Sequence, residues 1–137
     1  MLPKDIIARG VLATVLALLG TLALAAANID LTDFNDDVMK NMDDTVKSLD
    51  SDLAGHDARS AQVDAHSIRD GLHWAEEYFT RKGNVADAVQ LARQGEDLAA
   101  NVAKSAASND FDAALTSYES LVKTCRRCHD AYKPPEL

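Results

Sequence analysis

Apolar residues recur every three or four positions through most of the chain after residue 28. This spacing places them on one face of a helix, and no stretch shows the alternation of apolar and polar residues that indicates a strand. Proline, which interrupts helices, is absent between Lys4 and Pro134. The pattern therefore predicts an all-α protein.

The apolar stripes divide into four helices separated by short polar turns. The expected helices carry Leu31 to Leu53 (ending near Gly55), Ala58 to Phe79 (ending before Gly83), Val85 to Ala106 (after an N-cap at Asn84) and Phe111 to Tyr132 (after Asn109, ending at Pro134). Four such stripes can all be buried only by mutual packing, which predicts an antiparallel four-helix bundle. The many alanines of the second and third helices favour close approach of those helices.

Residues 1–27 have the features of a secretory signal peptide. Lys4 and Arg9 form a basic start, Gly10 to Leu24 is a run of small and apolar residues, and three alanines follow it at 25–27. The run is shorter than the roughly 20 apolar residues of a membrane span, so we expect cleavage, with an uncleaved anchor as the alternative. The mature domain would then be residues 28–137, without a stable membrane span, in the periplasm.

The charge of the chain limits the classes of partner that we expect it to bind. The formal net charge is −8, and because Lys4, Arg9 and Asp5 fall in the expected signal peptide, the remainder carries −9. Nucleic acids and anionic membrane surfaces would repel such a protein. We therefore expect no nucleic-acid partner, and a basic surface on any protein partner.

Cys125, Cys128 and His129 form the run Cys-Arg-Arg-Cys-His near the end of the last expected helix. C-x-x-C-H is the signature of c-type haem attachment, in which two thiols bind the haem covalently and the imidazole ligates iron. A structural zinc site would need about four ligands, yet the chain has two cysteines in all. The motif predicts one covalently attached haem c per chain, which could also supply the bulk that a core with few aromatic residues lacks.

On these residues the chain resembles the class II c-type cytochromes, the family of cytochrome c prime. The resemblance rests on the C-terminal CRRCHDAYK, from Cys125 to Lys133, and more weakly on VMKNM, from Val38 to Met42. It implies a four-helix bundle with haem on the C-terminal helix and His129 as the proximal iron ligand. It also implies that the first helix supplies the residue on the opposite haem face, which falls on Met39, with Met42 as a packing neighbour and the fallback ligand.

Other positions of the resemblance are less regular. Family members often carry a basic residue one turn before the distal position, where this chain has Asn35 beside two aspartates. Lys133 matches a basic position that often neighbours the haem, although a lysine also suits any helix C-terminus. The resemblance also implies a homodimer through the first two helices. A haem with two histidine ligands, using His73, is a further alternative.

The expected function is one-electron transfer by a periplasmic monohaem cytochrome, with redox proteins as partners and no catalysed reaction. If the sixth iron position were open, the protein would instead bind gases such as nitric oxide or carbon monoxide. The third reading is a helical bundle without haem whose Cys125 and Cys128 form a thiol-disulfide couple. No nucleophile triad, phosphate-binding loop or carboxylate pair placed for acid-base chemistry is apparent in the sequence.

Overall fold

The computed structural model describes residues 29–133, which fold as four helices packed against one another, with no strand in that range. The helices are α1 (Asp36–Ala54), α2 (Ala58–Lys82), α3 (Ala86–Ala107) and α4 (Phe111–Tyr132). The all-α prediction and the four-helix bundle are thus confirmed. The expected signal peptide at residues 1–27 lies outside the described residues.

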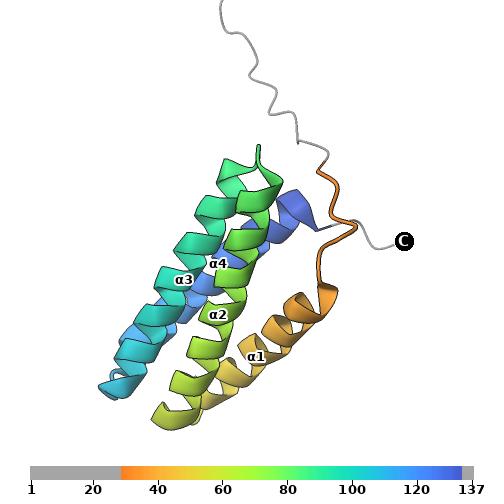
Figure 1. The fold of residues 1–137 in the computed structure, drawn as a ribbon. Helices are drawn as coiled ribbons and strands as arrows, with labels where there is room; N and C mark the ends of the chain where they lie inside the picture. Colours follow the sequence, from red (N-terminus) through yellow and green to blue (C-terminus); the bar gives the residue numbers. More distant parts are fainter. Residues whose placement is uncertain (1–28, 134–137) are drawn as a thin grey trace, which may run out of the picture.

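The two central helices, α2 and α3, lie side by side and antiparallel, with α4 behind them and α1 against α2 (Figure 1). The contact between α2 and α3 is the most extensive of the bundle, and that between α1 and α4 is slight. α1 and α4 are therefore the least tightly joined of the neighbouring helix pairs in the described residues.

The core explains why the central helices come so close. Most of its buried positions in α2 and α3 are alanines, and Gly95 of α3 faces Leu72 so closely that an added Cβ would lie 2.9 Å from the leucine Cδ1. Larger side chains, Leu49, Ile68 and Leu121, fill the layer beside the small ones and are fully buried. The small-residue prediction for the second and third helices therefore fits the observed packing.

The helix starts are set by side-chain caps, with one exception. Asn35, Asp57 and Asp110 each accept a hydrogen bond from a backbone N–H of the first turn that follows them. At α3 the expected cap was wrong: Asn84 has a positive φ of 58° and precedes the N-cap position, which Val85 occupies without a side-chain cap. The turn therefore uses the tolerance of asparagine for the left-handed conformation, not its capping oxygen.

Leu31 and Phe34 were expected within the first helix, but α1 begins only at Asp36. The segment 29–35 instead lies against α2, where the Phe34 ring makes edge contacts with Trp74 and Tyr78 at centroid distances of 5.1 and 4.8 Å. The Tyr78 hydroxyl donates a 2.7 Å hydrogen bond to Asp33. Leu31 and Phe34, although spaced as in a helix, therefore pack into an aromatic cluster on α2 and do not belong to α1.

Within residues 29–133, no helix is long and apolar enough to cross a membrane.

Candidate cofactor site between α1 and α4

The C-x-x-C-H run forms the last turns of α4. Cys125 and Cys128 are half-buried, whereas His129 is exposed. Helical spacings of three and four residues put all three on one side of α4. The helix ends at Tyr132, and the Lys133 backbone N–H donates to the His129 carbonyl, so the motif is held in regular helix to its last residue.

These side chains face a cavity that we call the inner hollow, of about 250 Å³. All four helices contribute to its walls, and most of the side chains are apolar. It is lined by Met39, Met42, Asp43, Val46, Ile68, Leu72, Ala75, Phe79, Leu91, Ala92, Val122, Thr124, Cys125, Arg126, Cys128 and His129. The two cysteines and the histidine therefore border the apolar centre of the bundle.

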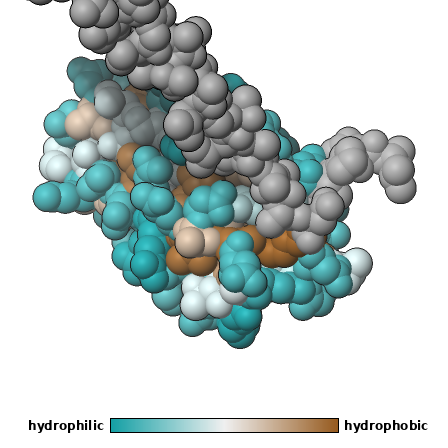
Figure 2. Space-filling view, turned by 90° about the horizontal axis from the view of Figure 1, so that it is seen from above, coloured by the Kyte–Doolittle hydropathy of each residue, from teal (hydrophilic) through white to brown (hydrophobic). Residues whose placement is uncertain are grey.

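A second cavity, the outer hollow, adjoins it toward the segment 29–35 and measures about 460 Å³. It is lined by Leu31, Phe34, Asp36, Met39, Lys40, Asp43, Phe79, Cys128, His129, Tyr132 and Lys133. Met39 and His129 border both hollows. Figure 2, which views the molecule from above the orientation of Figure 1, shows apolar surface between hydrophilic residues. Together the hollows form a slot with α1 on one side and α4 on the other.

The two methionines of α1 differ in their surroundings. Met42 is 7% exposed, and its Sδ lies only 2.5 Å from where a Cβ on Gly71 would be, so its thioether packs directly on α2. Met39 is half-buried and lines both hollows together with His129. Met42 also lines the inner hollow, but its sulfur is engaged at the contact between α1 and α2. Met39 is thus the methionine better placed to face His129.

Burial governs the acidity of the two thiols. It raises the pKa of Cys128 to about 11 and also raises the pKa of Cys125. The two cysteines are not joined in a disulfide. A catalytic redox cysteine needs a stabilised thiolate, and these surroundings disfavour it. The raised pKa values of the two thiols therefore argue against the interpretation of Cys125 and Cys128 as a thiol-disulfide couple.

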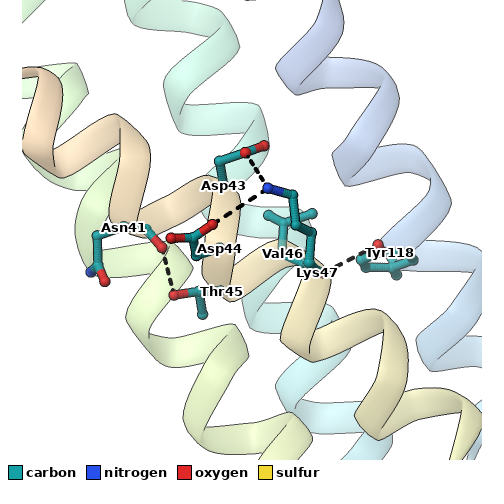
Figure 3. Close-up of polar contacts among 7 residues, drawn as sticks. All are labelled: Asn41, Asp43, Asp44, Thr45, Val46, Lys47 and Tyr118. Carbon is teal, nitrogen blue, oxygen red and sulfur yellow. Dashed lines mark hydrogen bonds and ion pairs between the residues drawn. The ribbon is translucent and has the colours of Figure 1, made fainter.

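Charged side chains outside the C-x-x-C-H motif also reach the slot. Asp43 lines both hollows and forms a 2.7 Å ion pair with Lys47, which lowers the pKa of the Asp43 carboxyl (Figure 3). Lys40 lines the outer hollow opposite Lys133, the lysine that the sequence pointed to. In the sequence, the one sign that these two side chains reach the slot is their position: Lys40 is next to Met39, and Asp43 is next to Met42.

One hydrogen bond links α4 to α1 at Val46, which lines the inner hollow. The Tyr118 hydroxyl of α4 donates to the Val46 carbonyl of α1 at 3.2 Å (Figure 3). It joins the two helices whose contact is otherwise slight, and so limits how far they can separate near the inner hollow.

His73 and His66 lie away from the slot. His73 lines neither hollow; it lies beside Glu76 and Glu96 on the outer side of α2 and α3. His66 lines a shallow groove between α1 and α2. A haem in the slot with His73 as a ligand does not fit this placement.

Comparison with known proteins adds no assignment: no protein-family model matches the chain, nor does any curated protein or solved structure.

The donor groups of the slot fit a haem better than a single metal ion. Among the described residues, Cys125, Cys128 and His129 do not bring their ligand atoms within 4.8 Å of one another, as a shared zinc ion would require. Two thiols and an imidazole spread along one helix face, beside an apolar slot of the size of ligand pockets, are what a covalently attached macrocycle needs.

Proposed function

We propose that this protein is a c-type cytochrome of class II type that carries one covalent haem and transfers single electrons. The observation that supports the proposal most directly is the shared lining of the slot, which puts both motif cysteines, His129 and Met39 around the same space. A motif match alone would not require a methionine on the opposite wall.

Each residue of the slot has a distinct task in this proposal. Cys125 and Cys128 would hold the haem covalently through their sulfurs, His129 would bind its iron through the imidazole, and Met39 would bind the iron through its sulfur from α1. When bound, the haem supplies a one-electron iron couple whose potential a thioether ligand raises. Because Met39 and His129 both belong to regular helices of one packed bundle, they would stay in place as the charge of the iron changes.

The mouth of the slot carries the charges that would orient the haem. Lys40 and Lys133 border the outer hollow and can neutralise propionate groups, whereas Asp43 lies beside His129 and is already paired with Lys47. The family's basic position near residue 35 is missing here, and Lys40 offers a cation from the same helix. The net charge of the chain makes a basic redox protein in the periplasm the expected partner.

A five-coordinate protein that binds gases is the second candidate. The observation that favours it is the apolar wall of the inner hollow on the α1 side, where Val46 and the packed Met42 could enclose a small diatomic ligand. In that case Met39 would leave the sixth position open.

Visible absorption spectra of the purified protein, produced in a host that attaches haem c, test both candidates. We expect a covalent haem with a low-spin spectrum, a methionine-to-iron charge-transfer band in the ferric state and no response to carbon monoxide. A high-spin spectrum that shifts with carbon monoxide would favour gas binding instead. Absence of a haem band would contradict both.

The covalent link has its own control. The double variant Cys125→Ser with Cys128→Ser is expected to lose all its haem on denaturing extraction, whereas the wild type retains it. Haem retained by the double variant after extraction would refute attachment at this motif.

A further inference from the structure

A cluster of three potential metal ligands lies on the outer side of α2 and α3. His73 and Glu76 are one turn apart on α2, and Glu96 comes from α3. One ligand atom from each lies within 4.8 Å of the other two. His73 Nδ1 is 3.4 Å from Glu96 Oε2 and 3.9 Å from Glu76 Oε2. None of the three lines the inner or outer hollow, so the cluster is separate from the proposed haem slot.

The two carboxyl groups are enclosed more than their place at the surface suggests. The side chains of Glu76 and Glu96 are 16% and 19% exposed, against 59% for His73. Glu96 Oε1 is buried and has no hydrogen-bond partner among the described residues. Burial and the neighbouring Glu76 raise the pKa of Glu96. An enclosed pair of acids with one orphaned oxygen is a place where a cation would be stabilised.

Arg93 is the one competing cation in contact with this pair among the described residues. Its Nε donates to Glu76 Oε1 at 2.6 Å. The other Glu76 oxygen, Oε2, is the one turned toward His73. The Arg93 pair therefore orients Glu76 without occupying the oxygen that faces the cluster.

We propose that His73, Glu76 and Glu96 bind one zinc ion, with water completing the coordination. Imidazole and carboxylate are both zinc donors, and three protein ligands plus water form the usual open tetrahedral set. Ligand atoms at about 2.1 Å from zinc lie about 3.4 Å apart in a tetrahedron. The spacing of His73 and Glu96 already matches this value, and Glu76 would need only a small side-chain shift. Such an ion would also join α2 to α3.

Titration calorimetry with zinc chloride tests the site on the protein after treatment with a chelator and removal of that chelator. The cysteines must be in thioether bonds to haem, or alkylated if no haem is attached, so that they cannot bind zinc themselves. We expect one zinc per chain in the wild type. His73→Ala and Glu96→Gln should each weaken binding by about tenfold or more, since even outer-shell changes cost about 10–100-fold.

His66→Ala is the matched control, because His66 is an exposed histidine two turns earlier on the same helix and outside the cluster. It should leave zinc affinity unchanged. Zinc should also raise the thermal unfolding midpoint of the wild type and of His66→Ala, but not that of His73→Ala. No zinc binding by the wild type, or equal losses in His66→Ala and His73→Ala, would overturn the proposal. Helical content measured without zinc verifies that each variant is folded.

Discussion

Met39 is the residue on which the proposed function depends most. Its side chain borders both hollows with His129, whereas the Met42 sulfur is packed against Gly71. We predict that Met39→Ala changes a low-spin spectrum to a high-spin one, removes the charge-transfer band and creates carbon monoxide binding, because it removes the distal ligand. The measurement is the ferric spectrum and a carbon monoxide titration of the ferrous protein.

Met42→Ala is the matched control for that experiment. It removes the other thioether of α1, three residues further along the helix, and should keep the low-spin spectrum. Its expected cost is in stability, about 2–5 kcal/mol for a buried methionine truncated to alanine. The reverse result, a spectrum lost in Met42→Ala and kept in Met39→Ala, would move the distal position to Met42.

The contact of α1 with α2 depends on the absence of a side chain at Gly71. A Cβ there would lie 2.5 Å from Met42 Sδ and 2.6 Å from its Cγ. Gly71→Ala should therefore destabilise the fold by about 1–3 kcal/mol from overpacking, less about 1 kcal/mol of gained helix propensity. Denaturant unfolding measures the change.

The same substitution in a Met42→Ala background provides the control. With the sulfur gone, the Gly71→Ala change should be neutral or stabilising by up to about 1 kcal/mol. Equal effects in the two backgrounds would show that Gly71 and Met42 do not constrain each other.

The segment 29–35 is attached to α2 through Asp33. Its carboxylate accepts a hydrogen bond from the Tyr78 hydroxyl and forms an ion pair with Lys82 at 2.6 Å. These two contacts, of which the one with Lys82 has the larger effect, lower the Asp33 pKa below its ordinary value of 3.8. A carboxyl whose pKa is lower in the folded state than in the unfolded state stabilises the fold when the pH is above the unfolded-state pKa. This stabilisation is lost as the pH falls through the folded-state pKa.

Asp33→Asn should therefore lower the thermal midpoint at pH 7 by a few degrees, and the difference from the wild type should close as the pH falls below 3.8. Circular dichroism melts across that range measure both midpoints. Asp30→Asn is the control, because Asp30 accepts its hydrogen bonds from Thr32 within the same segment. A difference that persists unchanged at pH 3 would refute the role of the Asp33 charge.

The elements of the fold were largely predictable because each apolar stripe is long and ends at a turn residue. The exceptions have local causes: Leu31 and Phe34 keep helical spacing, yet an aromatic cluster on α2 holds them outside α1. Likewise, Asn84 looks like a cap but adopts a positive φ. Spacing along the chain reports which residues can share a face, but not which tertiary contact claims them.

For the site, the sequence located the side chains of α4 because their spacing is a motif. It could not place Phe79, Lys40 or Asp43 at the slot, because their place in the lining depends on how the helices pack together. The angle between two helices depends on packing over the whole bundle, and no short pattern encodes it. The cluster of His73, Glu76 and Glu96 could not be predicted for a similar reason, since Glu96 approaches His73 from another helix.

At the scale of the whole molecule, the inner hollow leaves apolar side chains of all four helices facing a cavity. An empty apolar cavity costs about 24 cal/mol per Å³, so the inner hollow of about 250 Å³ corresponds to an upper limit of about 6 kcal/mol. The real cost is smaller because the hollow opens toward solvent and its walls can relax. Even part of this value is large against the 5–15 kcal/mol that typically separates folded from unfolded chains.

We therefore predict that the wild-type chain, produced without haem attachment, melts at a temperature lower by roughly 10 °C or more than the haem-loaded protein. The melt should be broader, and the haem-free chain should bind a dye for exposed apolar surface while keeping most of its helix content. Circular dichroism melts and dye fluorescence make the comparison, with the double Cys→Ser variant, freed of any non-covalent haem by extraction and refolding, as a second haem-free sample. If both haem-free samples melted as sharply and at the same temperature as the loaded protein, the slot would not be a gap in the core, and the argument that a haem completes the bundle would fail.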